Sequence, residues 1–363
     1  MIFLKIGILT GGGDCAGINS AIEGATYAAE ELNHKLFGIL RGWNGLINFD
    51  EIPLDSKIVD GIGERAGTML GTSRTNPFAS KDCKEDRSGI MIDNLKEHHY
   101  NALIVIGGED TLGVAYKIDQ LWSHVVGIPK TMDYDLQTYS LGYDTAVEKI
   151  RNYLFDIRTT AKSHRRVHVV EVFGRNTGHV AFRAGVASSA DVVLIPEIHY
   201  DISEVCKNVK KAYDKKGYSI VIVAEGAKSI KNEEQTFLSE EVDEFGHKKL
   251  GGICYRLAEH IRKRLGIQIR ATPYTYGSRS GESGSFDSFM GEKLGRAAIY
   301  AICLGKHGVA VAGIDGKVIK TMPLEELIKP KSVNVDEIAL YEKRINFGRP
   351  PQAYEPKIEL IKT

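Results

Sequence analysis

Short runs of apolar residues recur along the chain, and segments with helix-like spacing of apolar positions separate them. The apolar runs, which are typical of buried strands, lie at Leu4–Thr10, Ala102–Gly107, Val167–Phe173, Asp191–Pro196, Ser219–Ala224 and Val309–Gly313. The helix-like segments are Gly17–Leu32, Ile202–Lys216, Leu250–Leu265 and Met290–Leu304. Continuous apolar strands that alternate with helices indicate parallel sheets covered on both faces. The pattern therefore predicts an α/β fold.

Glycine residues cluster directly after several of the predicted strands. The chain contains 38 glycines in 363 residues, above the usual share of about 7%. The relevant positions are Gly11–Gly13, Gly107–Gly108, Gly174, Gly226, Gly251–Gly252 and Gly277. Ligands of open α/β sheets bind at the carboxyl ends of strands, where glycine lets backbone N–H groups approach a phosphate. Tight turns alone would explain some of these glycines, but their placement favours a phosphate-binding site.

Composition narrows the functional classes. Lys plus Arg and Asp plus Glu each number 47, so the formal net charge is zero, whereas nucleic-acid binders usually carry a basic excess. The content of 43% hydrophobic and 26% charged residues excludes a disordered chain. No apolar run approaches the roughly 18 residues of a membrane span, and no signal-peptide pattern is seen. The five scattered cysteines are expected to be reduced and buried. Together with the neutral charge and the lack of a membrane span, they favour a cytoplasmic protein with no membrane or nucleic-acid partner.

Two acidic segments indicate which phosphate chemistry to expect. The glycine loop after the first strand lacks the dinucleotide spacing G-x-G-x-x-G, and no P-loop motif occurs in the chain. Instead, Gly107–Thr111 and Pro129–Asp135 each follow an apolar strand and bring carboxylates to the same edge of the sheet. Such carboxylates can hold Mg²⁺ or accept a proton from a hydroxyl group. Arginine side chains suited to phosphate groups occur at Arg166, Arg270 and Arg279.

Nine short motifs in the same order resemble the phosphofructokinase A family, from residue 5 to about residue 320. They are Gly7–Asn19, Gly67–Arg74, Gly107–Thr111, Pro129–Asp135, Gly142–Ala146, Ser163–Arg166, Glu171–Arg175, Ile195–Glu197 and Val223–Gly226. The resemblance implies two Rossmann-like three-layer α/β/α lobes. We expect residues 1–144 plus about 278–328 to form a phosphoryl-donor lobe and residues 145–277 to form an acceptor lobe. Residues from about 329 to 363 would form a C-terminal segment packed on the lobes.

The resemblance also assigns roles to individual residues. Asp133 would be the base that deprotonates the C1 hydroxyl of fructose 6-phosphate, with support from Asp135, while Thr131 would contact the transferred phosphoryl group. Glu109 and Asp110 would bind Mg²⁺. The remaining donor-binding positions are Gly12, Arg74, Asp110, Thr111 and Lys130.

The acceptor side is implied in the same way. The residues expected to bind the sugar phosphate are Arg166, Phe173, Gly174, Arg175, Glu225, Arg270, Tyr276 and Arg279. Arg175 would also act in catalysis, and Arg279 would bind the 6-phosphate. A neighbouring subunit would contribute Arg166 and Arg270, so the resemblance implies a homo-oligomer, a dimer or a tetramer.

Two positions favour pyrophosphate as the phosphoryl donor. Members of the family that use ATP carry glycine where this chain has Asp110, because the nucleotide must pass there. An aspartate fills that space and repels the α-phosphate. Members that use pyrophosphate have this aspartate together with a lysine, here Lys130, whose ammonium group neutralises charge on the leaving phosphate. Lysine alone also occurs in some ATP users, so Asp110 is the more informative of the two.

Two departures from the family pattern lie on the acceptor side. Tyr134 stands where the family motif has asparagine, and its larger ring would reshape the floor beneath the acceptor. Tyr276 stands at a histidine position of short-chain relatives, while Arg279 is retained. These tyrosines leave open a kinase of another ketose phosphate such as sedoheptulose 7-phosphate. Two further alternatives also stay open: an ATP-dependent phosphofructokinase and a non-catalytic sugar-phosphate-binding paralogue.

Overall fold

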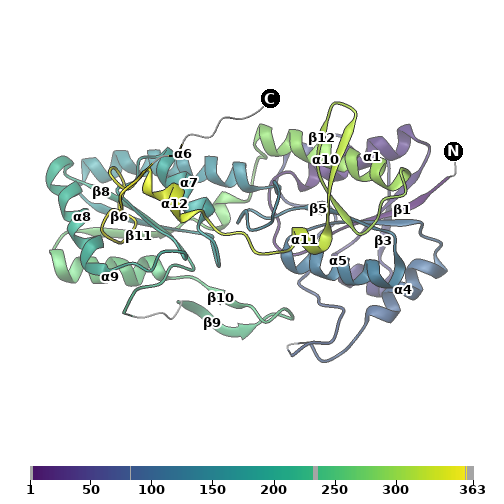
Figure 1. Cartoon of the computed structure of the whole chain (residues 1–363), viewed down its shortest axis with the longest axis horizontal. Helices are drawn as coiled ribbons and strands as arrows, with labels where there is room; N and C mark the ends of the chain where they lie inside the picture. The colour runs from purple at the N-terminus through teal and green to yellow at the C-terminus, as the bar shows by residue number, and fades with distance from the viewer. Residues whose placement is uncertain (1–2, 82, 232–235, 356, 358–363) are drawn as a thin grey trace. The chain divides into compact units, whose positions relative to one another are not determined.

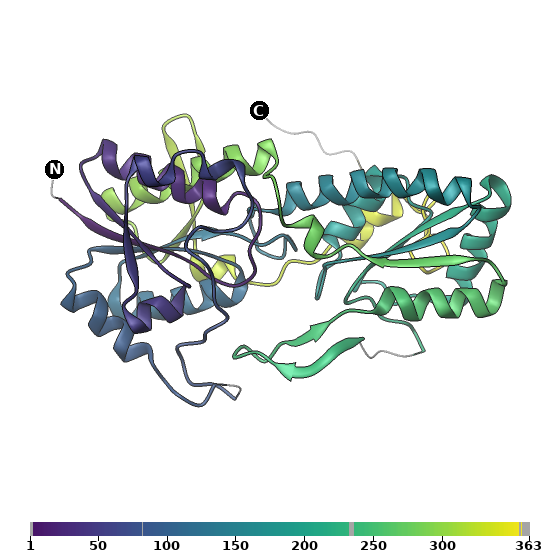
Figure 2. The ribbon, with the colours of Figure 1, turned by 180° about the vertical axis from the view of Figure 1, so that it is seen from behind.

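The computed structural model describes residues 3–81, 83–231, 236–355 and 357, which form two compact units (Figures 1 and 2). Unit 1 comprises Met1–Lys149, Ser239–Lys249 and Thr275–Lys331. Unit 2 comprises Ile150–Leu238, Leu250–Tyr274 and Ser332–Thr363. Helix α6 (Tyr143–Ser163) begins in unit 1 and ends in unit 2.

Unit 1 is built on a twisted sheet with helices on both faces. In the described part of the chain the sheet has seven strands in the order β13-β12-β5-β4-β1-β2-β3. The strands are β1 (Lys5–Thr10), β2 (Lys35–Ile39), β3 (Glu51–Leu54), β4 (Ala102–Gly107), β5 (Val125–Pro129), β12 (Val309–Asp315) and β13 (Val318–Pro323). The central strands are parallel, while β3 and β13 pair antiparallel at the two edges.

The helices of unit 1 divide between the two faces of this sheet. They are α1 (Ile18–Glu31), α2 (Trp43–Asn48), α3 (Ser56–Val59), α4 (Ser88–Glu97), α5 (Glu109–Trp122), α10 (Ser285–Cys303) and α11 (Leu324–Leu327), with short 3-10 turns η1 (Ile62–Glu64) and η2 (Tyr276–Ser278). On β4, Ile104 packs in the hydrophobic core beneath α1 and α10, and its neighbour Val105 packs in the opposite core beneath α4 and α5. Figures 1 and 2 show α1 and α10 side by side. The strand is therefore apolar throughout because both of its faces are buried.

Unit 2 repeats the same plan with fewer strands. Its sheet has the order β11-β6-β8-β7, all parallel, in the described residues. The elements are β6 (Val167–Val172), α7 (His179–Ala187), β7 (Val192–Leu194), α8 (Ile202–Lys216), β8 (Ser219–Ala224), α9 (Ile253–Leu265), β11 (Ile269–Pro273) and α12 (Val335–Ala339). One face of the sheet packs on α8 and α9, where Val221 and Leu257 are buried. The predicted α/β class is confirmed.

Two segments bear on the expected lobe boundaries. The C-terminal segment was expected to pack on the lobes, and Ser332–Thr363 groups with unit 2, where Phe347 is buried and Val193 N donates to the Asn346 carbonyl at 2.9 Å. The hairpin of β9 (Phe237–Val242) and β10 (Lys248–Leu250) was expected in the acceptor lobe, yet its residues Ser239–Lys249 group with unit 1.

The cysteines largely follow expectation. All five are free thiols. Cys15, Cys83, Cys206 and Cys254 are buried, whereas Cys303 is exposed at the end of α10, within 3.2 Å of His34 Nε2. The expectation of burial is therefore wrong for Cys303. Among the residues that the structure describes, no helix combines the length and the apolarity needed to cross a bilayer.

Helix α10 begins at Ser285, before the predicted start at Met290, because Ser285, Asp287 and Ser288 of its first turn are polar and interrupt the apolar repeat. Asp287 in this turn is fully buried. Its carboxylate accepts hydrogen bonds from Tyr139 Oη at 2.5 Å, Gly142 N at 2.7 Å, and Thr145 N and Oγ1 at 2.7 and 2.6 Å. This side chain therefore fixes the segment that leads into α6.

We expect Asp287→Ala to lower the free energy of unfolding by about 3 kcal/mol or more, because several buried donors lose a charged acceptor. Urea unfolding followed by circular dichroism measures the change. The exposed Asp315 is the matched control, since Asp315→Ala is expected to change stability by less than about 0.5 kcal/mol. Equal stability of the two variants would contradict this role of Asp287.

Candidate active site

Three loops of unit 1 meet at one edge of its sheet. Strands β1, β4 and β5 are parallel neighbours, so the loops that follow them emerge at the same edge. Gly11 N donates to the Ile106 carbonyl at 3.0 Å, and Lys130 N donates to the Gly107 carbonyl at 2.9 Å. The predicted donor residues after these strands are therefore brought together.

The glycines of this edge are required by close packing around Thr111. A Cβ atom on Gly11 would lie 2.6 Å from Thr111 Cγ2, and one on Gly107 would lie 2.3 Å from Thr111 Cβ. Gly12 has a φ of 76°, in the left-handed region that favours glycine. Thr111 is itself buried at the start of α5. The backbone of the loop after β1 therefore approaches α5 without side chains between them.

Two cationic side chains border the same glycine loop. Lys130 is 4% exposed, and its Nζ donates to the Gly13 carbonyl at 2.5 Å. Burial lowers the pKa of Lys130 below its ordinary value. Arg279 Nη1 would lie 3.0 Å from a Cβ atom on Gly13, and its Nε is 3.4 Å from Asp14 Oδ1. The ring of Tyr276 lies 4.8 Å from the guanidinium carbon of Arg279. Positive charge is thus concentrated beside an open backbone, which suits an anionic ligand.

Acidic side chains gather at the same edge. Burial, and then the charges of Asp110 and Asp135, raise the pKa of Glu109. The pKa of Asp135 is also raised, chiefly by burial, with a smaller contribution from Asp110. Like charges that act on one another in this way favour a bound cation.

The carboxylates fit Mg²⁺ only if a ligand supplies the remaining oxygens. Within the described residues, no group of three or more His, Cys, Asp or Glu side chains is close enough to hold a metal ion by itself. Mg²⁺ usually binds one or two carboxylates and completes its shell with water and substrate phosphates. Glu109 and Asp110 supply two carboxylates in the first turn of α5. Asp135 Oδ1 adds a buried carboxylate oxygen that has no hydrogen-bond partner among the described residues.

The loop after β5 carries the predicted base. Asp133 N donates to Thr131 Oγ1 at 3.2 Å, and Ser140 Oγ donates to the Thr131 carbonyl at 2.8 Å. Lys331 N donates to the Asp135 carbonyl at 3.0 Å. The three catalytic candidates of unit 1, Thr131, Asp133 and Asp135, are thus on one braced loop.

Tyr134 adopts a backbone conformation that would suit the asparagine of the family pattern better than a tyrosine. Its φ is 57°, a region in which asparagine is enriched and a bulky side chain is unusual. The ring is stacked on Tyr143 at a centroid distance of 4.3 Å, and Lys331 Nζ lies 3.7 Å from its centroid. These contacts compensate for backbone strain in the loop.

The acceptor candidates of unit 2 lie at two opposite ends of its sheet. Phe173, Gly174 and Glu225 follow β6 and β8, where Glu225 N donates to the Val172 carbonyl at 2.9 Å and Gly226 N to the Gly174 carbonyl at 3.0 Å. A Cβ atom on Gly226 would lie 1.9 Å from the carbonyl oxygen of Arg175. The loops after β6 and β8 are therefore packed closely against each other.

Arg166 and Arg270 lie at the amino end of the strands. Arg166 precedes β6, and Arg270 pairs with His168 across β6 and β11. The pKa of His168 is lowered by burial and then by these two arginines. A six-residue strand spans about 20 Å. Within one chain, Arg166 and Arg270 are therefore close to each other but not to Phe173 or Glu225.

Sequence reasoning missed the partners of two donor residues. Arg74 Nη1 lies 2.5 Å from Asp243 Oδ2, and Asp110 Oδ2 lies 2.9 Å from His247 Nε2. Asp243 and His247 are far from these residues in the chain. A turn pattern, Asp-x-x-Gly at Asp243–Gly246, marks a hairpin there, but it does not indicate where the hairpin packs.

This sheet edge combines cationic groups and open backbone, which suit an anion, with acidic side chains. Such a combination is suited to phosphoryl transfer and indicates an α/β phosphotransferase. Comparison with known proteins identifies the family. Residues 5–302 match the phosphofructokinase family. The chain belongs to this family, and the sequence-based assignment is confirmed.

Relatives and solved structures agree with this placement. A pyrophosphate--fructose 6-phosphate 1-phosphotransferase of Dictyoglomus thermophilum is 41% identical, with 95% of this chain and 98% of that protein covered. An ATP-dependent 6-phosphofructokinase of Corynebacterium efficiens is 37% identical, with 90% and 94% covered. The crystal structure of a pyrophosphate-dependent phosphofructokinase from Marinobacter aquaeolei superposes with a TM-score of 0.78 at 19% identity, covering 99% of both chains. The last comparison supports the fold alone.

Proposed function

We propose that this protein transfers a phosphoryl group from pyrophosphate to the C1 hydroxyl of fructose 6-phosphate, a reversible step of glycolysis that takes place in the cytoplasm. The observation that carries the donor assignment is the pair Asp110, in the first turn of α5 after β4, and Lys130, directly after the neighbouring strand β5. Asp110 occupies the space that a nucleotide needs, and Lys130 supplies positive charge to the smaller donor. The names of the relatives, such as the one from Dictyoglomus thermophilum, favour the same donor.

In this mechanism the donor phosphates lie against the backbone of Gly12 and beside Lys130, Thr111 and Arg74. Lys130 stabilises the charge that develops on the leaving phosphate, and burial strengthens this interaction. Glu109 and Asp110 would hold Mg²⁺, which when bound neutralises the charge of the phosphates. Asp133 takes the proton from the acceptor hydroxyl, and the carboxylate of Asp135 adds negative charge to the same loop. Thr131 contacts the transferred phosphoryl group.

On the acceptor side, Phe173, Gly174, Arg175 and Glu225 bind the sugar, while Arg279 and Tyr276 bind its 6-phosphate. Arg166 and Arg270 serve the same acceptor from a second copy of the chain. The distance of about 20 Å along β6 separates them from the acceptor residues of their own unit, which supports a homo-oligomer, a dimer or a tetramer.

Initial rates with pyrophosphate, ATP and ADP, each tested against fructose 6-phosphate and sedoheptulose 7-phosphate, test the proposal. We expect turnover with pyrophosphate and fructose 6-phosphate. Efficient use of ATP with little use of pyrophosphate would contradict the donor assignment and favour the second candidate, the ATP-dependent reaction named for the relative from Corynebacterium efficiens. Faster turnover of the larger sugar would contradict the acceptor assignment.

We expect Asp110→Gly to raise the ratio of kcat/KM for ATP to that for pyrophosphate by at least about tenfold, since one favourable contact of about 1.4 kcal/mol corresponds to that factor. The glycine removes both the bulk and the charge of the carboxylate. Asp110→Asn is the matched variant, because it removes the charge and keeps the volume. An unchanged ratio in both variants would contradict the steric and electrostatic explanation.

A further inference from the structure

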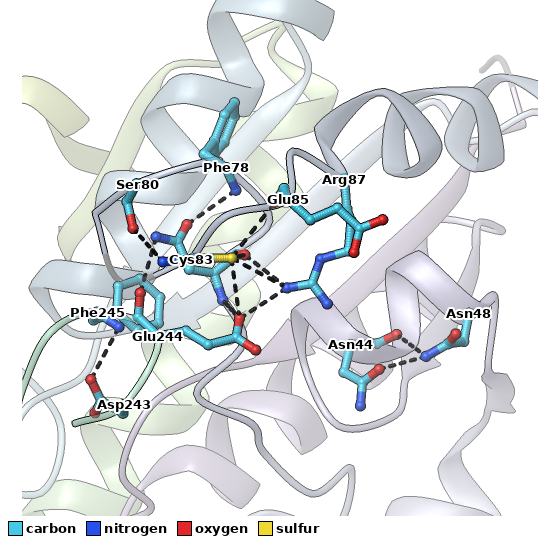
Figure 3. Close-up of polar contacts among 11 residues, drawn as sticks. Asn44, Asn48, Phe78, Ser80, Cys83, Glu85, Arg87, Asp243, Glu244 and Phe245 are labelled. Atoms are coloured by element: carbon cyan, nitrogen blue, oxygen red, sulfur yellow. Dashed lines mark hydrogen bonds and ion pairs between the residues drawn. The ribbon is translucent and has the colours of Figure 1, made fainter. Parts of the chain in front are cut away.

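The tip of the β9–β10 hairpin, residues Asp243–His247, packs within unit 1 beside donor-side residues. Two side chains anchor it there. Glu244 Oε2 accepts hydrogen bonds from Arg87 Nη2 at 2.9 Å and Asn76 N at 2.7 Å. Phe245 packs against the hydrophobic core that includes Leu112 of α5. Figure 3 shows Glu244 directed toward Arg87, with Phe245 and Asp243 on the neighbouring stretch of the hairpin.

Asp243 links the turn of this hairpin to a donor residue. Its Oδ1 accepts hydrogen bonds from Phe245 N at 3.1 Å and His247 N at 3.0 Å, so the carboxylate is held by its own turn. Its other oxygen lies 2.5 Å from Arg74 Nη1. Burial opposes ionisation, but the hydrogen bonds from His247 N and Arg74 keep the pKa of Asp243 below its ordinary value. Arg74, whose side chain is 52% exposed, is thus held by a fixed charged partner.

His247 makes the second link, to the residue that distinguishes the two donors. His247 Nε2 lies 2.9 Å from Asp110 Oδ2. In the tautomer that carries the proton on Nε2, His247 donates this hydrogen bond to the carboxylate. This contact restricts the rotamer of Asp110, whose side chain is 40% exposed and would otherwise be free to turn away.

We propose that Asp243 and His247 are positioning residues of the donor site, which hold Arg74 and Asp110 in the arrangement that fits pyrophosphate and excludes a nucleoside triphosphate. The inference rests on the proposed function and deepens it. The two hairpin residues act through the donor residues and do not contact the reacting atoms. Arg74 retains its remaining guanidinium N–H groups for phosphate, and Asp110 keeps the position where a nucleotide would pass.

The test measures KM and kcat of Asp243→Asn and His247→Ala with pyrophosphate, ATP and fructose 6-phosphate. We expect KM for pyrophosphate to rise about three- to tenfold, as for loss of one charge-assisted contact at a partly exposed site, with kcat changed less than KM. The ratio of kcat/KM for pyrophosphate to that for ATP should fall in His247→Ala. His247→Gln, which keeps an N–H donor for Asp110, should restore much of this ratio.

The controls separate a positioning role from a structural one. KM for fructose 6-phosphate and the melting temperature should stay at wild-type values in both variants, which general damage to unit 1 would not allow. Glu241→Gln removes an exposed carboxylate from β9 of the same hairpin and should leave KM for pyrophosphate unchanged. A KM for pyrophosphate that is unchanged or lower in Asp243→Asn and His247→Ala would overturn the inference. If wild-type protein used ATP and not pyrophosphate, the rates of the wild-type protein alone would contradict the proposed function, independently of these variants.

Discussion

We expect Asp133→Asn to lower kcat for phosphorylation of fructose 6-phosphate by about 10² to 10⁴, the usual contribution of a positioned general base. The amide has the shape of the carboxylate but cannot accept the proton of the C1 hydroxyl. The loop should keep its conformation, because the hydrogen bond to Thr131 Oγ1 comes from the backbone N–H of Asp133 and not from its side chain. The steady-state rate with saturating pyrophosphate is the measurement.

Binding of fructose 6-phosphate to Asp133→Asn, measured by calorimetry, should stay within a few-fold of wild type, because the loss is in the chemical step. Asp315→Asn, at an exposed site of the same unit, is the control and should retain full activity. A variant at Asp133 with undiminished turnover would remove this residue from the mechanism. Wild-type protein that bound the sugar phosphate without turnover would instead favour the non-catalytic paralogue.

The layered fold could be predicted because its signal is local. The runs Ala102–Gly107 and Ile220–Ala224 contain no polar side chain, and the structure buries both faces of β4 and β8. Gly11, directly after β1, and Gly107, the last residue of β4, marked the sheet edge in the sequence, and in the structure both pack on Thr111 where a side chain would not fit. Hydrophobic pattern and glycine placement thus identify a buried strand and its functional end.

The rest of the donor site depends on contacts between distant segments. His247 meets Asp110 across 137 residues of sequence, and the hairpin that carries it has only a weak alternating pattern. The start of α10 was missed because Asp287 is polar and its burial is decided by donors at Tyr139, Gly142 and Thr145. No local pattern indicates that a polar side chain will find such partners, so these features follow from the tertiary structure alone.

Lys130 gives the second large effect: we expect Lys130→Met to lower kcat with pyrophosphate by about 10² to 10³, as for loss of one preorganised electrostatic contact in a water-poor site. Lys130 is 4% exposed, and its Nζ is held by the Gly13 carbonyl, so no reorganisation is needed when negative charge develops on the leaving phosphate. Methionine fills a similar volume without the charge.

A structural role of Lys130 can be distinguished by experiment from an electrostatic role. If Lys130 served only to hold the loop after β1, Lys130→Met would lower the melting temperature and weaken fructose 6-phosphate binding along with kcat. If it stabilises the leaving phosphate, kcat falls while the affinity for fructose 6-phosphate is retained. Lys320→Met, at an exposed position of the same unit, controls for the loss of a surface charge. Undiminished kcat with pyrophosphate in Lys130→Met would refute the electrostatic role of Lys130.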